Sequence, residues 1–123
     1  MNQLSGNTLA YLGDSVFEMA VREHLIAKGI TKVDELHKQA IVFTSATGQM
    51  KAFDFLEPLL SENEINIFKR GRNGESTRKP KNASLATYQK ATGFEALVGY
   101  LYIENQHQRL HELFEKIFEN IIK

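Results

Sequence analysis

Apolar residues recur every three to five positions along most of this sequence, and no stretch alternates between apolar and polar residues as a half-buried strand would. The pattern predicts an all-α fold of about six helices. We expect them at about residues 8–28, 31–42, 44–57, 61–71, 85–104 and 110–122.

Particular residues mark where these helices begin and end. Gly29 stops the first helix. Thr31 followed by Asp34 resembles a capping box that starts the second, with the shorter Asp where Glu or Gln is usual. Residues 61–64, Ser-Glu-Asn-Glu, form a full capping box for the fourth helix, which ends at Gly71.

Size and composition narrow the class of protein. With 123 residues, 42% of them hydrophobic, the chain makes one domain, residues 1–123, with a real core. It has no cysteine, which excludes disulfide frameworks, Cys-based zinc sites and thiol catalysis. The longest nearly apolar stretch, residues 96–103, is far shorter than the roughly 20 residues of a spanning helix. No signal-peptide pattern opens the sequence, so we expect a cytoplasmic protein with no membrane partner.

Residues 69–81 concentrate positive charge in a chain whose formal net charge is zero. They hold six basic residues and one Glu, which gives a local charge of six minus one, or +5. The six are Lys69, Arg70, Arg72, Arg78, Lys79 and Lys81. Gly71, Gly74 and Pro80 predict an exposed loop. A solvated charged surface or helix capping would explain part of this charge, but its excess over what capping needs favours contact with a phosphate backbone.

Two carboxylates on the two most apolar helices are candidates for a metal site. Asp14 follows Gly13, and a glycine inside a helix costs about 1 kcal/mol relative to Ala, so it usually marks a close approach. Glu95 lies among apolar residues, where a carboxylate is costly unless it is paired or binds a cation. If the two helices meet, both acids could hold a hard cation such as Mg²⁺. Alternatively, Asp14 could hydrogen-bond a neighbouring element and Glu95 could face water.

Other polar residues have simpler interpretations. Glu18 shares a helix face with Asp14, but it also lies four residues before Arg22, where an ordinary helix ion pair forms. Three residues near the C-terminus have metal-ligand spacing: His107, His111 and Glu115. Because no third strong ligand accompanies the histidines, we interpret them as surface residues.

The helices at residues 8–28 and 85–104 carry more apolar surface than a domain this small needs. A helix that is apolar over most of its circumference must be covered on several sides. Either these helices lie at the centre of the bundle or a second subunit covers part of them.

Two motifs resemble the catalytic domain of the ribonuclease III family. Residues 9–18, LAYLGDSVFE, resemble its signature helix, and residues 94–102, FEALVGYLY, resemble its second acidic helix. Residues 69–73, KRGRN, and 80–82, PKN, resemble the short bacterial branch, the Mini-ribonucleases III. The resemblance covers nearly the whole chain in order.

This resemblance implies an all-helical, homodimeric endonuclease that hydrolyses double-stranded RNA with Mg²⁺, or Mn²⁺ as a substitute, leaving 5′-phosphate and 3′-hydroxyl ends. For the short branch it implies maturation of both ends of the 23S ribosomal RNA precursor, with a large-subunit ribosomal protein as a further candidate partner. By the resemblance, Asp14 and Glu95 would be the catalytic, metal-binding residues. As a separate expectation, Glu18 would assist them without binding the metal directly. The six basic residues would grip RNA phosphates by shape rather than sequence.

The sequence departs from the full-length family at three acidic positions, where Asn7, Ala10 and Thr92 stand instead. Of the family's acidic cluster, two carboxylates then remain, a reduction that the short branch shares. We also expect no appended double-stranded-RNA-binding domain. The reduction leaves open a catalytically inactive helical module that binds structured RNA or an RNA-processing partner. If the carboxylates of Asp14 and Glu95 converge, the active enzyme is favoured over the inactive module. A third alternative, a pure dimerisation domain, would not need the basic segment.

Overall fold

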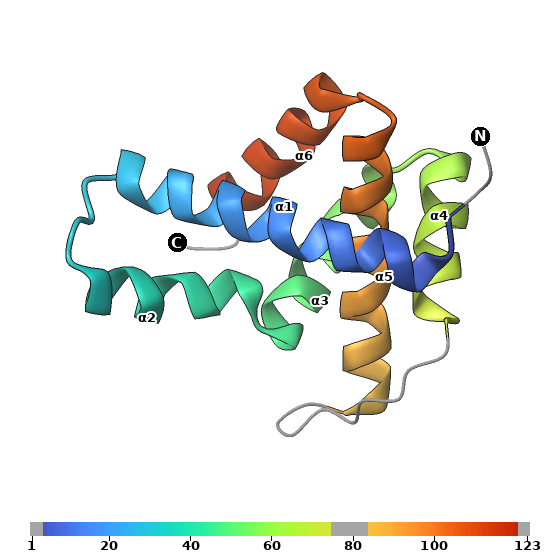
Figure 1. The fold of residues 1–123 in the computed structure, drawn as a ribbon, viewed down its shortest axis with the longest axis horizontal. Coiled ribbons are helices and arrows are strands. Elements are labelled where there is room, and N and C mark those ends of the chain that lie inside the picture. Colours follow the sequence, from blue (N-terminus) through green and yellow to red (C-terminus); the bar gives the residue numbers. More distant parts are fainter. Residues whose placement is uncertain (1–3, 75–83, 121–123) are drawn as a thin grey trace.

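The computed structural model describes residues 4–74 and 84–120, and over these ranges it contains helices and no strand (Figure 1). The α-helices are α1 (Gly6–Ala27), α2 (Val33–Thr44), α3 (Ala46–Leu56), α4 (Glu62–Arg72), α5 (Leu85–Ile103) and α6 (His107–Asn120), and a short 3₁₀ helix, η1 (Glu57–Leu59), follows α3. The predicted all-α class with about six helices is confirmed. None of these helices has the length and hydropathy needed to cross a membrane.

The crossing of α1 over α5 organises the fold (Figure 1). A Cβ on Gly13 of α1 would overlap the carbonyl oxygen of Glu95, and a Cβ on Gly99 of α5 would overlap the carbonyl oxygen of Leu9. The two glycines therefore let the two backbones touch. The close approach of two helices that Gly13 predicted is therefore present. The helices α3 and α4 also pack against α5.

The core around this crossing is rich in aromatic rings. Phe17 of α1 meets Phe94 of α5 edge to face, with ring centroids 5.0 Å apart. Phe53 of α3 stacks on Phe68 of α4, with centroids 3.7 Å apart. Burying each such side chain contributes roughly 1.5–3 kcal/mol to folding. The helices that carry Asp14 and Glu95 therefore pack through the same hydrophobic core.

Several predicted helix ends are confirmed. Gly29 has a φ of 97° just after α1, the left-handed conformation that glycine adopts readily. At the start of α4, the Ser61 hydroxyl accepts a bond from the Glu64 amide at 3.1 Å. The Glu64 carboxylate accepts one from the Ser61 amide at 2.8 Å, which completes the capping box.

Three predicted helix starts differ from the structure, and one of them is that of the last helix, which begins at His107 and not at about residue 110. The first helix begins at Gly6, ahead of Thr8, because Ser5 is the N-cap and its hydroxyl accepts a bond from the Thr8 amide at 3.1 Å. The second begins at Val33 with Lys32 as its N-cap and no side-chain capping bond, so the expected capping box from Thr31 is not formed.

Gly71 does not end α4 as predicted. The helix continues to Arg72, with Asn73 as its C-cap. A Cβ on Gly71 would lie 2.5 Å from the Cβ of Ala96, so this glycine admits α5 rather than terminating a helix. Lys69 and Arg70 lie in the last turn of α4, inside the predicted range 61–71, and Arg72 belongs to the same turn rather than to an exposed loop.

Candidate active site

Asp14 and Glu95 converge where α1 crosses α5. Gly13 rests against the backbone of Glu95, and Asp14 is the next residue along α1. The two carboxyl groups are close enough to hydrogen-bond to each other. Asp14 is exposed while Glu95 is half-buried, so the pair is open to solvent on the Asp14 side.

The surroundings of Glu95 favour its protonated form. Burial, the hydrogen bond to Asp14 and the charge of Asp14 together raise the pKa of Glu95 to about 8, although a hydrogen bond from Gln49 acts in the opposite direction. Two carboxylates in contact repel each other unless a proton or a cation lies between them. Carboxylate oxygens are also the ligands that hard divalent cations prefer. The residues present therefore fit a divalent cation such as Mg²⁺.

Gln49 is a member of this site that the sequence did not reveal. It lies in the first turn of α3, is 3% exposed, and donates from Nε2 to Oε2 of Glu95 at 3.1 Å. The two residues are 46 positions apart, and no motif around Gln49 signals the contact.

Glu18 makes the ion pair that its spacing favoured. Its Oε2 lies 3.3 Å from Nε of Arg22, one helical turn further along α1. An assisting role for Glu18 at the acid pair stays a prediction.

At three positions the full-length family has an acidic residue and this chain does not, so none of them adds a carboxylate to Asp14 and Glu95. Asn7 is exposed and Ala10 is buried, both in the first half of α1. The Thr92 hydroxyl donates to the carbonyl of Tyr88 at 3.0 Å. Across the described ranges, no cluster of three or more His, Asp or Glu side chains is arranged to hold a metal.

The histidines of α6 lie at the surface, as interpreted. His107 and His111 are both exposed. His111 pairs with Glu115 at 2.5 Å, one turn along the same helix.

The basic residues of α4 differ in their surroundings. Lys69 is exposed, whereas Arg70 is half-buried and donates to the carbonyl of Leu4. Arg72 donates from Nε to Oδ1 of Asn73 at 3.1 Å, and its guanidinium carbon lies 5.8 Å from the ring centroid of Phe68. The remaining three predicted RNA contacts lie outside the described residues: Arg78, Lys79 and Lys81.

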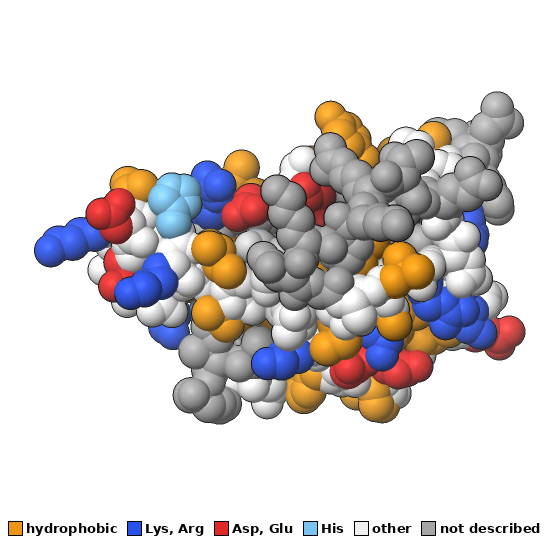
Figure 2. All heavy atoms as spheres, turned by 90° about the horizontal axis from the view of Figure 1, so that it is seen from below, with side chains coloured by type: hydrophobic (Ala, Val, Ile, Leu, Met, Phe, Trp, Pro, Cys, Tyr) orange, Lys and Arg blue, Asp and Glu red, His pale blue; other side chains and the backbone are white. Residues whose placement is uncertain are grey.

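Figure 2 shows one face of the molecule, on which the coloured Lys and Arg side chains are interspersed with acidic and apolar ones. The described residues on this face therefore form no uniform positive patch, and RNA contact there would depend on individual cations.

Fold and site together define an all-helical domain with a pair of carboxylates suited to a divalent cation. The Ribonuclease III domain family matches residues 7–106. The chain is 46% identical over 110 residues to Mini-ribonuclease 3 of Brevibacillus brevis, covering 89% of this chain and 82% of that protein. It is 44% identical over 115 residues to Mini-ribonuclease 3 of Streptococcus pneumoniae, covering 92% and 90%. The chain therefore belongs to the ribonuclease III family, a family of endoribonucleases.

A solved structure supports the fold independently. The crystal structure of a Fusobacterium nucleatum protein superposes with a TM-score of 0.86 at 24% identity, covering 96% of this chain and 94% of that one. At this identity the likeness concerns the arrangement of helices alone.

Proposed function

We propose that this protein is a metal-dependent endoribonuclease that cuts double-stranded RNA and matures the 5′ and 3′ ends of the 23S ribosomal RNA precursor in the cytoplasm. The observation that carries the proposal is the convergence of Asp14 and Glu95 at the crossing of α1 and α5. Membership of the ribonuclease III family and the names of the Mini-ribonuclease 3 relatives support the reaction and the substrate class.

In this proposal Asp14 and Glu95 hold Mg²⁺, or Mn²⁺ in its place. When bound, such an ion polarises a phosphoryl oxygen and lowers the pKa of a coordinated water so that hydrolysis can proceed at neutral pH. Glu95 must release its proton to solvent before it can act as a ligand. Because Asp14 is the exposed member of the pair, the RNA phosphate approaches from the α1 side.

Affinity for RNA comes from the domain's own cations, with residues 1–123 acting as a single catalytic domain. In this proposal Lys69 and Arg72, which lie in the last turn of α4, contact RNA phosphates. An A-form duplex offers a regular phosphate geometry but little sequence information in its deep major groove, so such contacts read shape.

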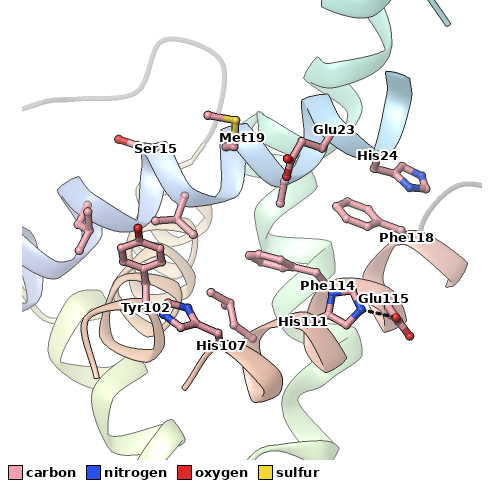
Figure 3. Close-up of a pocket in the computed structure, with 14 residues that line it drawn as sticks. Ser15, Met19, Glu23, His24, Tyr102, His107, His111, Phe114, Glu115 and Phe118 are labelled. Atoms are coloured by element: carbon pink, nitrogen blue, oxygen red, sulfur yellow. Dashed lines mark ion pairs between the residues drawn. The ribbon is translucent and has the colours of Figure 1, made fainter. Parts of the chain in front are cut away.

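We also propose that the protein acts as a two-fold dimer. A cavity of about 700 Å³ lies between α1, the end of α5 and α6, with Leu12, Met19, Tyr102 and Phe114 among its lining residues (Figure 3). Met19 is 61% exposed and Tyr102 44%, and Tyr11, nearby on α1, is 84% exposed. Large apolar side chains exposed together in this way mark an interaction surface.

A dimer formed through this surface would also cover the surplus apolar area of α1 and α5. Because a two-fold interface is the same on both subunits, each protomer would contribute one carboxylate pair. Two such pairs allow one cut in each RNA strand. A large-subunit ribosomal protein that reshapes the precursor is a further candidate partner.

The function is tested by incubating a long RNA duplex with the protein in Mg²⁺ or in chelator. We expect fragments with 5′-phosphate and 3′-hydroxyl ends in Mg²⁺ only. Duplex binding without cleavage in either condition would instead support the inactive RNA-binding module.

A further inference from the structure

Gln49 is one of two buried polar or charged side chains in the described part of the chain, and the other is Glu64. Glu64 has a structural role, because it completes the α4 capping box and accepts a bond from Arg109 Nε at 2.8 Å. Gln49 instead donates to Glu95, a member of the candidate active site, at 3.1 Å. Burying an amide is costly unless it forms a hydrogen bond, and the bond to Glu95 offsets this cost for Gln49.

The backbone that carries Gln49 is held firmly. Ser45 caps α3, and its hydroxyl accepts a bond from the Gly48 amide at 3.1 Å. Gly48 packs against the end of α2, where an added Cβ would lie 2.7 Å from the carbonyl oxygen of Phe43. The first turn of α3 therefore has little freedom to move. The backbone of Gln49 is held in place, and its side-chain amide reaches Glu95 from there.

We propose that Gln49 is a positioning residue, whose amide holds the carboxylate of Glu95 in the orientation that lets it bind a divalent cation together with Asp14. This inference rests on the proposed function, since the metal site is itself a proposal. A donor on one carboxylate oxygen fixes the plane of the group and leaves other lone pairs for a ligand. A neutral amide does so without supplying a positive charge that would compete with the cation.

The test replaces Gln49 with Met, which keeps a long unbranched side chain and removes the donor. Gln39→Met is the matched control. Gln39 of α2 donates from Nε2 to Oε2 of Glu35, also at 3.1 Å, so the control removes the same kind of bond from a pair one helical turn apart in α2. Comparing the two variants separates loss of a Gln–Glu bond in general from loss of this one.

The readout is the affinity of the RNA-free protein for Mn²⁺, measured by calorimetry, together with the Mg²⁺ dependence of single-turnover cleavage of saturating duplex. Removing a partner that orients a metal ligand lowers metal affinity by about 10–100-fold. We expect a loss of this size for Gln49→Met and none for Gln39→Met. Excess Mg²⁺ should restore much of the cleavage rate of Gln49→Met, and duplex binding in chelator should not change.

The outcomes distinguish this inference from the function on which it rests. If wild-type protein binds Mn²⁺ no more tightly than Asp14→Asn, the metal site is wrong and both proposals are overturned. If wild-type protein binds more tightly than Asp14→Asn but Gln49→Met binds like wild type, only the role of Gln49 is overturned. Should Gln49→Met fail to fold by circular dichroism, Gln49→Asn decides in the same way, because its amide is one methylene too short to reach Glu95.

Discussion

Gly13 of α1 packs so closely against Glu95 of α5 that a Cβ on the glycine would overlap the glutamate's carbonyl oxygen. Asp14 is the next residue along α1, so contact between the two backbones brings the two carboxyl groups together. The spacing of the acid pair is therefore set by main-chain packing rather than by the reach of flexible side chains.

The first prediction concerns the helix crossing. Gly99→Ala should destabilise the protein by roughly 1–3 kcal/mol or more, because its Cβ would overlap the carbonyl oxygen of Leu9. The loss should appear in urea denaturation despite the gain of about 1 kcal/mol that Ala brings to a helix interior. Gly29→Ala is the comparison: nothing lies within 4 Å of its added Cβ, and its cost comes from a φ of 97° alone. A Gly99→Ala protein as stable as wild type would mean that α1 and α5 can separate without penalty.

The second prediction is a pH dependence of stability in metal-free protein. The pKa of Glu95 is raised to about 8 in the folded state, from an ordinary value of 4.5. Between these values the folded state binds more protons than the unfolded state, so the free energy of unfolding should fall as pH rises from about 5 to about 8. Above about pH 8 this contribution should level off.

Glu95→Gln is the control for this pH dependence, since Gln does not ionise. Unfolding by urea at pH 6 and pH 8.5 should show a smaller difference for the variant than for wild type. In the wild type, saturating Mg²⁺ should also reduce the difference, because cation binding favours the ionised pair. An identical pH profile for wild type and Glu95→Gln would place the titrating group elsewhere.

The third prediction concerns the cations of α4. Replacing Lys69 and Arg72 with Ala should weaken duplex binding and reduce the slope of log affinity against log salt by about 0.7–0.9 per lost phosphate contact. Arg70→Ala should also lower stability, because its guanidinium donates to the Leu4 carbonyl. Lys38→Ala, an exposed change on α2, serves as the control. Equal salt slopes for the double variant and wild type would move the RNA-binding surface away from α4.

The fourth prediction concerns the dimer. Light scattering of wild type should give about 28 kDa, twice the chain mass of 14.0 kDa. Met19→Lys should give a monomer, because it places a charge among the residues that line the cavity between α1 and α6 (Figure 3). Ile41→Lys on α2 should remain dimeric, although Ile41 and Met19 are both 61% exposed. A monomeric wild type at micromolar concentration would remove the basis for paired cutting.

The sequence predicted the fold class and the acid pair because both depend on local signals. Helical periodicity is repeated in every segment, and Gly13 marked the close approach that brings Asp14 to α5. The apolar surroundings of Glu95 already made it a candidate partner for Asp14, and the resemblance to a known family favoured that pairing over the alternatives.

What the sequence did not predict depends on tertiary packing. Gly71 resembles a helix terminator in sequence, but in the fold it makes room for Ala96. Arg70 belongs to a basic run, yet its partner is a backbone carbonyl 66 residues away. Gln49 reaches Glu95 only because α3 packs on α5, and nothing around either residue encodes that distance.

Single-turnover cleavage by Asp14→Asn measures whether the acid pair is needed for the reaction. The substitution keeps the size of the side chain and removes the charge that a divalent cation needs. We predict that the variant folds, binds a saturating RNA duplex in chelator as wild type does, and in Mg²⁺ cleaves it no faster than the chelator control. Cleavage by Asp14→Asn at a rate near that of wild type would contradict the account.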